Sequence, residues 1–270
     1  MAPLAARRPA CLLALLSVAA ALFLTPTALA AGGKTGQVTV FWGRNKAEGS
    51  LREACDSGMY TMVTMSFLDV FGANGKYHLD LSGHDLSSLG ADTKHCQSKG
   101  VPVSLSIGGY GTGYSLPSNR SALDLFDHLW NSYFGGSKPS VPRPFGDAWL
   151  DGVDLFLEHG TPADRYDVLA LELASTHPRG PGKPLHLTAT VVRNLGWEGS
   201  WDKWTAAYPA TRFYVGLTAD DKSHQWVHPK NVYYGVAPVA QKKDNYGGIM
   251  LWDRYFDKQT NYSSLIKYYA

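Results

Sequence analysis

The stretch that most constrains the fold of this chain is residues 150–159, which read Leu-Asp-Gly-Val-Asp-Leu-Phe-Leu-Glu-His. Its short apolar run is bounded by glycines, which is typical of a buried strand rather than of a helix. Because alternate side chains of a strand share a face, Asp154, Phe156 and Glu158 are predicted to point the same way. The opposite face, which a helix could cover, would carry Val153, Leu155 and Leu157.

Two carboxyl groups on the inward face of such a strand cost free energy unless they line a site or are hydrogen-bonded. Glu158, at the end of the strand, could act as a general acid with a raised pKa. The alternative is that Asp154 and Glu158 are structural acids inside a barrel, because perturbed acids also occur in purely structural networks. His159 could relay a proton from Glu158 or simply hydrogen-bond its neighbours.

Strand-like and helix-like segments alternate along the rest of the chain. The predicted strands are residues 37–42, 61–70, 101–107, 152–158, 185–192, 212–218 and 247–252. This alternation predicts an α/β fold with a parallel sheet and, at this length, a TIM-type (β/α) barrel in one domain, residues 31–270. Sites in such barrels form where the strands end, so the segments that follow the strands are the candidate positions.

Two helices between the strands are the clearest. Residues 121–134 place apolar side chains at helical spacing, and either Asn119 or Ser121 is expected as the N-cap. Residues 164–174 form the second, opened by Pro162 and ended before Pro178.

Residues 1–30 are predicted to be a secretory signal peptide. Arg7 and Arg8 form a basic region, residues 11–24 are apolar, and Ala-Leu-Ala at 28–30 gives a cleavage site. The apolar region is too short for a comfortable membrane span, and no second span follows. The mature chain is therefore expected to begin at Ala31 and to be secreted.

Two cysteines remain after cleavage, Cys55 and Cys96. An even number of cysteines in an oxidising compartment favours a disulfide between them, and two free buried thiols are the alternative. Asn119 and Asn261 each begin an Asn-x-Ser glycosylation sequon in a polar segment.

The composition excludes several classes of function. A net charge of +2 over 270 residues does not indicate binding to nucleic acid or to an anionic membrane. No His or Cys cluster has metal-ligand spacing and no glycine-rich turn has the form of a phosphate loop, so no metal and no cofactor are expected. The 8 Trp and 15 Tyr residues suit sugar stacking, protein interfaces or plain core packing.

Two motifs resemble glycoside hydrolase family 18, the chitinase family. Asp151, Asp154 and Glu158 are similar to its D-x-x-D-x-D-x-E signature, and residues 104–109, Ser-Leu-Ser-Ile-Gly-Gly, are similar to its S-x-G-G motif. Further likeness to plant class III chitinases lies in residues 40–51, 67–72 and 247–252. The resemblance thus covers nearly the whole mature chain, and it implies catalytic roles for the three acids.

The third Asp of the signature is absent, and Phe156 occupies its position. Family-18 hydrolysis is substrate-assisted, with the acetamido oxygen of the substrate as nucleophile, and the missing Asp would stabilise that group. Phe156 cannot do so, and Tyr110, directly after the two glycines, is expected to fill the same subsite. Both residues resemble the xylanase-inhibitor branch of the family, in which the catalytic acids are vestigial.

A βα unit of the family is also missing. The chain runs from residues 190–193 directly into residues 194–197, where the family would place about thirty more residues, the size of one βα unit. The sixth strand and the helix before it are therefore expected to be deleted, which leaves the barrel incomplete.

The resemblance implies an inhibitor of microbial family-10 and family-11 xylanases, acting as a monomer in the extracellular space of plant tissue, the apoplast. Arg179 would enter the cleft of family-11 enzymes, and Lys230 would approach the catalytic carboxylates of family-10 enzymes. The alternatives are a chitin-oligosaccharide binder or weak hydrolase, and a protein made inert by the deletion.

Overall fold

The computed structural model describes residues 34–72, 76–161, 163–176, 185–190, 212–243 and 245–270. The predicted signal peptide, residues 1–30, and the junction of the predicted deletion, residues 190–197, lie wholly or almost wholly outside the described residues. None of the described helices is both long enough and apolar enough to cross a membrane.

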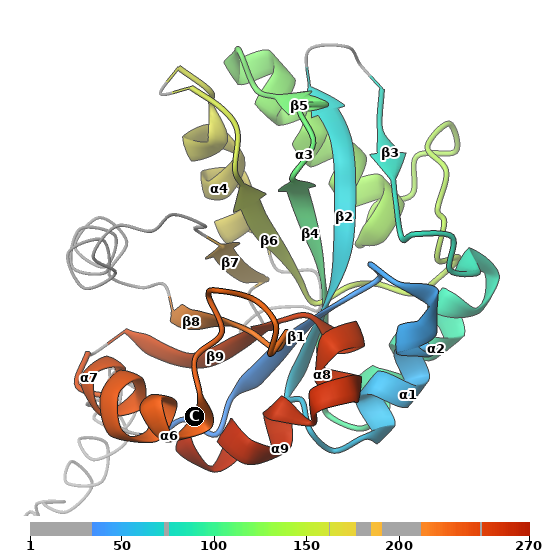
Figure 1. The fold of residues 1–270 in the computed structure, drawn as a ribbon. Helices are drawn as coiled ribbons and strands as arrows, with labels where there is room; N and C mark the ends of the chain where they lie inside the picture. The colour runs from blue at the N-terminus through green and yellow to red at the C-terminus, as the bar shows by residue number, and fades with distance from the viewer. Residues whose placement is uncertain (1–33, 73–75, 162, 177–184, 191–211, 244) are drawn as a thin grey trace, which may run out of the picture.

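Seven parallel strands form a continuous sheet that is nearly closed into a barrel (Figure 1). In the order β7-β6-β4-β2-β1-β9-β8, they are His186–Thr190, Gly152–Leu157, Val103–Gly109, Met62–Gly72, Val38–Trp42, Tyr246–Trp252 and Phe213–Thr218. Two short strands pair with β2, β3 (His78–Leu79) and β5 (Tyr114–Ser115). All seven predicted strands are present, so the α/β barrel predicted from the alternating pattern is confirmed.

The barrel is open between β7 and β8 in the part of the chain that the structure describes. These strands are the two ends of the hydrogen-bonded order, and no ladder joins them there. Both also contain exposed or half-exposed residues, whereas every residue of β4 is buried. An incomplete barrel with its gap at this point agrees with the predicted loss of one strand.

Helices surround the sheet and alternate with its strands (Figure 1). The helices are α1 Leu51–Asp56, α2 Leu89–Ser98, α3 Asn119–Tyr133, α4 Tyr166–Ala174, α6 Pro229–Asn231, η3 Val232–Val236, α7 Ala237–Ala240, α8 Arg254–Thr260 and α9 Tyr262–Ile266. Single 3-10 turns occur at η1 Lys46–Glu48, η2 Leu86–Ser88 and η4 Lys267–Tyr269.

The two predicted helices exist, but the predicted N-cap of α3 was wrong. Ser118 is the cap: its backbone is extended and its Oγ accepts a hydrogen bond from the Ser121 N–H at 3.1 Å. Ser121 instead occupies the third helical position and accepts from the Ser118 N–H, which completes a reciprocal capping box. The helix predicted at residues 164–174 begins at Tyr166, and both prolines expected to bound it lie outside the described residues.

The alternation predicted for β6 is confirmed. Asp154 and Phe156 point into the barrel, where Phe156 belongs to a small cluster with Phe41 and Phe67. Val153 and Leu155 lie in the large outer core that the helices cover. Inward and outward side chains of the strand therefore serve two separate apolar layers.

Cys55 of α1 and Cys96 of α2 form a disulfide, with their Cα atoms 5.4 Å apart. The predicted pairing is confirmed and the alternative of two free thiols is excluded. The bond joins two neighbouring helices on the side of the barrel away from the gap (Figure 1).

Candidate functional site

Asp154 lies at the centre of β6 and is fully buried. Its carboxyl group accepts hydrogen bonds from the hydroxyls of Ser106 at 2.6 Å, Thr188 at 2.7 Å and Thr190 at 3.1 Å. Burial raises its pKa, although the three hydroxyl donors oppose that shift. The ladders explain the arrangement, because Ser106 on β4 and Thr188 on β7 are the direct neighbours of Asp154.

Phe156 lies one inward position further along β6, and aromatic rings surround it. Its ring centroid is 5.0 Å from that of Phe67, 5.7 Å from that of Phe41 and 5.7 Å from that of Trp252. Only 1% of its surface is exposed. A compact aromatic cluster therefore fills the barrel between Asp154 and the ends of the strands.

Tyr110 covers this cluster from the end of β4. Its ring meets those of Phe67, Phe156 and Trp252 edge to face, while 53% of its surface remains exposed. Burial raises the pKa of Tyr110 to about 12, and the nearby carboxyl of Glu158 contributes to the shift. Tyr110 therefore remains an uncharged aromatic side chain at neutral pH.

The two glycines before Tyr110 allow β4 to run close to its neighbours. A Cβ on Gly108 would lie 2.2 Å from the backbone oxygen of Phe156, and one on Gly109 would lie 2.9 Å from the Phe67 ring. Both glycines also have positive φ angles, which residues with a side chain rarely adopt. The glycine pair of the S-x-G-G motif is thus required by the packing that places Tyr110.

Glu158 lies just beyond β6 and is half-buried. Burial is the main reason that its pKa is raised, while His159 lowers it. The Tyr114 hydroxyl fixes the backbone here: it accepts from the N–H groups of Glu158 at 3.1 Å and His159 at 3.0 Å, and it donates to the Gly109 oxygen at 3.0 Å. A raised pKa suits a general acid, so Glu158 retains the property that the sequence suggested.

Among the described residues, His159 forms no hydrogen bond with the Glu158 side chain and bonds instead to Tyr110 and Tyr114. Its Nε2 donates to the backbone oxygen of Tyr110 at 3.0 Å. This bond joins the segment after β6 to the segment after β4. His159 therefore helps to hold Tyr110 and Glu158 on the same rim.

Asp151 does not join the other two acids. It precedes β6, so the strand, which rises about 3.3 Å per residue, separates it from Glu158. Its Oδ2 accepts from the Val103 N–H at 2.8 Å and from the Gln97 side chain at 2.9 Å. At this position Asp151 ties the start of β4 and α2 to the start of β6.

The rim after β1 is organised by a buried carboxylate. Oε1 of Glu48 accepts from the N–H groups of Gly43 and Asn45, each at 2.9 Å, and contacts His84 Nε2 at 3.1 Å. Arg44, which lies between Gly43 and Asn45 in the chain, forms an ion pair with Asp80 in which Nη1 and Oδ2 are 3.0 Å apart. The Arg44 guanidinium also lies 5.3 Å from the Phe67 ring centroid, so the rim carries a cation beside the aromatic cluster.

Asp253, which follows β9, is a further acid of this rim. It is 4% exposed and caps α8 by accepting from the Phe256 N–H at 3.2 Å. Burial raises its pKa to about 6, with Glu48 adding to the shift. Asp253 directly follows the strand predicted at residues 247–252, but the sequence did not single it out, because its burial depends on distant segments.

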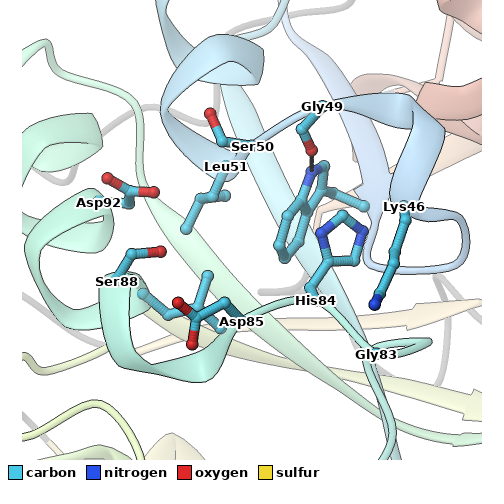
Figure 2. Close-up of a pocket in the computed structure, with 11 residues that line it drawn as sticks. Lys46, Gly49, Ser50, Leu51, Gly83, His84, Asp85, Ser88 and Asp92 are labelled. Carbon is cyan, nitrogen blue, oxygen red and sulfur yellow. Dashed lines mark hydrogen bonds between the residues drawn. The ribbon is translucent and has the colours of Figure 1, made fainter.

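A separate groove of about 430 Å³ lies beside the β1–α1 connection (Figure 2). The His84 ring packs against Trp42 there with ring centroids 4.2 Å apart and planes at 40°, and the Trp42 indole N–H donates to the Gly49 backbone oxygen at 3.0 Å. Its lining is Trp42, Lys46, Gly49, Ser50, Leu51, Gly83, His84, Asp85, Ser88, Leu89 and Asp92. The groove thus adjoins the rim after β1, where His84 contacts Glu48, and none of the predicted catalytic acids lines it.

The remaining predicted site residues are either exposed on the surface or outside the residues that the structure describes. Lys230 of α6 is exposed, and Arg179 lies outside the described residues. Asn119, the first residue of α3, and Asn261, between α8 and α9, are both exposed, as a glycosylation acceptor requires. Within the described part of the chain, no group of three or more His, Cys, Asp and Glu residues could hold a metal ion.

The family model for glycosyl hydrolases family 18 matches residues 37–210. The chain belongs to this family. A wheat (Triticum aestivum) relative, "Xylanase inhibitor protein 1", is 87% identical over 304 positions that span all of both chains. Because this chain has 270 residues, 34 of those positions have no counterpart in it, about the size of one βα unit.

Two further similarities extend over most of the chain. A rice (Oryza sativa subsp. japonica) relative, also named "Xylanase inhibitor protein 1", is 46% identical, with 89% of this chain and 91% of the relative covered. The crystal structure of the xylanase and alpha-amylase inhibitor protein XAIP-II from Scadoxus multiflorus has a TM-score of 0.75 and 34% identity. That match covers 85% of this chain and 97% of the other.

Proposed function

We propose that this chain is a catalytically silent member of glycosyl hydrolases family 18 that inhibits endo-xylanases. The observation that carries the proposal is the 87% identity, over the whole of both chains, to the wheat relative named as a xylanase inhibitor. The rice relative, with the same name at 46% identity, supports it independently. Two relatives with the same name at such different sequence identities are stronger support than a similar fold, because one fold can serve many functions.

The geometry of the site supports the absence of chitinase activity. Hydrolysis assisted by an acetamido group needs a polar partner between Asp154 and Glu158, and the side chain at that position is the buried ring of Phe156. Tyr110 then covers the ring from the rim. Glu158 retains a raised pKa, but no carboxylate lies beside it on β6 to stabilise the attacking oxygen.

The contacts with xylanases are proposed to lie on two separate surfaces. Lys230 is exposed on α6 and would approach the two catalytic carboxylates of a family-10 enzyme. Arg179, outside the described residues, would enter the cleft of a family-11 enzyme. A cation placed between two carboxylates is electrostatically favourable, and removing one side of a buried charged contact costs about 2–5 kcal/mol.

The cellular context is part of the same proposal. Residues 1–30 would direct secretion, and the mature chain would act as a monomer in the apoplast against xylanases of fungi or bacteria, in plant defence. The Cys55–Cys96 disulfide supports an oxidising compartment, because cytosolic proteins rarely keep such bonds. Glycans at Asn119 and Asn261 would accompany passage through the secretory pathway.

Sugar binding at the rim is the alternative function, favoured by one observation. Tyr110 is 53% exposed and Trp252 half-exposed, and their rings lie 5.5 Å apart, as in a site that stacks against sugars. Under this alternative the protein would bind chitin oligosaccharides or hydrolyse them weakly, without inhibiting xylanases. A barrel with neither activity is the third candidate.

One pair of assays tests the proposal. The purified mature protein is titrated into a family-10 and a family-11 xylanase, and it is assayed in parallel on chitin oligosaccharides. Inhibition without chitin hydrolysis is the expected result. Hydrolysis without inhibition would replace the proposal with the alternative, and neither activity would favour an inert barrel.

A further inference from the structure

Two segments at the carboxyl-terminal end of the fold, residues 228–242 and 261–270, lie against each other (Figure 1). The rings of Tyr233 and Tyr269 have centroids 4.6 Å apart, and the Gln241 side-chain amide donates to the Tyr269 backbone oxygen at 2.6 Å. Together with Lys34, which approaches the Tyr269 ring, these segments form a surface that we call the lysine–tyrosine face.

Tyrosine rings are unusually accessible on this face. Tyr234 is 76% exposed, Tyr268 is 70% exposed and Tyr233 is 44% exposed. These three, with Leu265, make up half of the eight large apolar or aromatic side chains that are exposed in the described part of the chain. Such a concentration of exposed rings is typical of a binding surface rather than of chance.

The charged side chains of the face have one sign. Neither residues 228–242 nor residues 261–270 contain Asp or Glu. Lys34, Lys230, Lys242 and Lys267 lie on these segments or beside them, and none of the four forms an ion pair with another described residue. The face therefore attracts anions, and its ammonium groups are available to a partner.

Cations and rings on this face lie close enough to act together. The Lys34 Nζ lies 5.8 Å from the centroid of the Tyr269 ring, and the Lys267 Nζ lies 5.2 Å from that of the Tyr268 ring. At these distances the ammonium group is attracted to the ring, and long lysine chains can still reach an external charge. A ligand that combines flat apolar surfaces with carboxylates would match both features.

We propose that the lysine–tyrosine face binds a linear polysaccharide that carries uronic acid carboxylates. Tyrosine rings offer an apolar face to sugar rings and a hydroxyl to their polar groups. Every cation of the face is Lys, which is depleted in protein–protein interfaces, whereas Arg is enriched there. Among the described residues of the face, Leu265 is the one exposed aliphatic side chain of comparable size, so a polyanionic glycan fits this surface better than an acidic protein does.

The polysaccharide site does not require xylanase inhibition, but it overlaps the contact proposed for family-10 enzymes. Lys230 belongs both to the face and to the contact proposed for family-10 enzymes. A bound polysaccharide would then weaken family-10 inhibition and leave family 11 unaffected, if the two-surface proposal holds.

The test uses sodium polygalacturonate as the probe, in affinity electrophoresis of the folded full-length mature protein. Fully methyl-esterified polygalacturonate and neutral arabinoxylan serve as uncharged comparison polymers. We expect retardation by polygalacturonate that weakens as sodium chloride is added, with little effect of the two uncharged polymers. Tyr234→Ala with Tyr268→Ala, and separately Lys242→Gln with Lys267→Gln, should each reduce the affinity about tenfold, roughly 1.4 kcal/mol.

Two matched variants control for unspecific effects of exposed side chains. Leu171→Ala truncates a side chain of α4 that is 71% exposed, and Lys76→Gln removes an exposed cation before β3. Both should bind polygalacturonate like the unchanged protein. Equal losses in the control variants, or equal binding of the uncharged polymers, would overturn the proposal.

Xylanase inhibition, measured on the same variants, separates this proposal from the proposed function. No binding of polygalacturonate with inhibition intact would overturn the polysaccharide site alone. Binding without any inhibition would support the polysaccharide site and overturn the proposed function instead. Loss of family-10 inhibition in the tyrosine variant, with no polysaccharide binding, would make the face a protein-docking surface and overturn the inference.

Discussion

The rings of Tyr110 and Phe156 meet edge to face, with centroids 5.4 Å apart and planes at 68°. One residue follows β4 and the other lies inside β6, and the parallel register of these strands brings them together. Under the proposed function, this covered aromatic ring occupies the position at which chitin hydrolysis would require a carboxylate. It is the structural basis for the first prediction.

The unchanged protein should show no measurable hydrolysis of chitin oligosaccharides. The double variant Phe156→Asp with Tyr110→Gly restores the acid and opens the subsite, and it should gain activity because one electrostatic partner is typically worth roughly 100-fold or more in rate. Phe156→Leu with Tyr110→Gly is the control that opens the subsite without an acid. Robust chitin hydrolysis by the unchanged protein would contradict the prediction.

Lys230→Ala should weaken inhibition of family-10 xylanases and leave family-11 inhibition unchanged, and Arg179→Ala should do the reverse. Loss of a buried charged contact is worth about 2–5 kcal/mol, or roughly 30-fold to 4,000-fold in the inhibition constant. Inhibition constants for both xylanases measure the effect, with Lys76→Ala as the matched exposed-lysine control. If either substitution abolished both activities, the two-surface proposal would be wrong.

Asp253 should make the protein less stable as the pH rises from about 4 to about 6. Burial raises its pKa to about 6 from the ordinary 3.8, so the folded state holds this proton more tightly than the unfolded chain. The contribution to the free energy of unfolding is therefore complete below pH 3.8 and is lost as the pH passes through about 6. A shift of this size corresponds to about 3 kcal/mol.

Urea unfolding at several pH values measures this contribution of Asp253. Asp253→Asn should reduce the loss of stability between pH 4 and 6, because Asn still caps the helix but does not titrate. Asp85→Asn is the control, since the pKa of this exposed capping acid is lowered by its bonds to Ser87. Identical pH profiles for the unchanged protein and Asp253→Asn would exclude the proposed titration.

Removing the Cys55–Cys96 disulfide should destabilise the protein by about 4 kcal/mol. The two cysteines are 41 residues apart, and chain entropy predicts a cost of about this size for opening such a loop. The midpoint of urea unfolding of Cys55→Ala with Cys96→Ala measures the effect, and the unchanged protein under reducing conditions should unfold at a similar midpoint. An unchanged midpoint in the double variant would show that the bond contributes little.

Amide hydrogen exchange should find β7 and β8 opening before β6. The first two strands end the hydrogen-bonded order and hold several exposed residues, whereas β6 pairs with β4 on one side and β7 on the other. Backbone groups at an open sheet edge exchange through small local openings, which cost less than global unfolding. Uniformly slow exchange across β7 and β8 would mean that the barrel closes around the deletion.

The amino-acid sequence by itself determined where the strands lie and which side chains of β6 share a face. Period-two alternation depends only on the local geometry of a strand, so Asp154 and Phe156 could be placed on the inward face before any contact was known. The disulfide could also be predicted from the sequence, because only Cys55 and Cys96 remain after removal of the predicted signal peptide. The same local pattern could not place the cap of α3, where three polar residues compete within four positions.

Only the tertiary structure decided what surrounds these residues. Asp154 is held by Ser106 and Thr188, which lie 48 and 34 residues away and meet it only through the register of β4, β6 and β7. The sequence also grouped Asp151 with Glu158, whereas the length of the strand separates them. Hydrogen bonding and desolvation depend on which segments approach in space, and chain spacing alone does not contain that information.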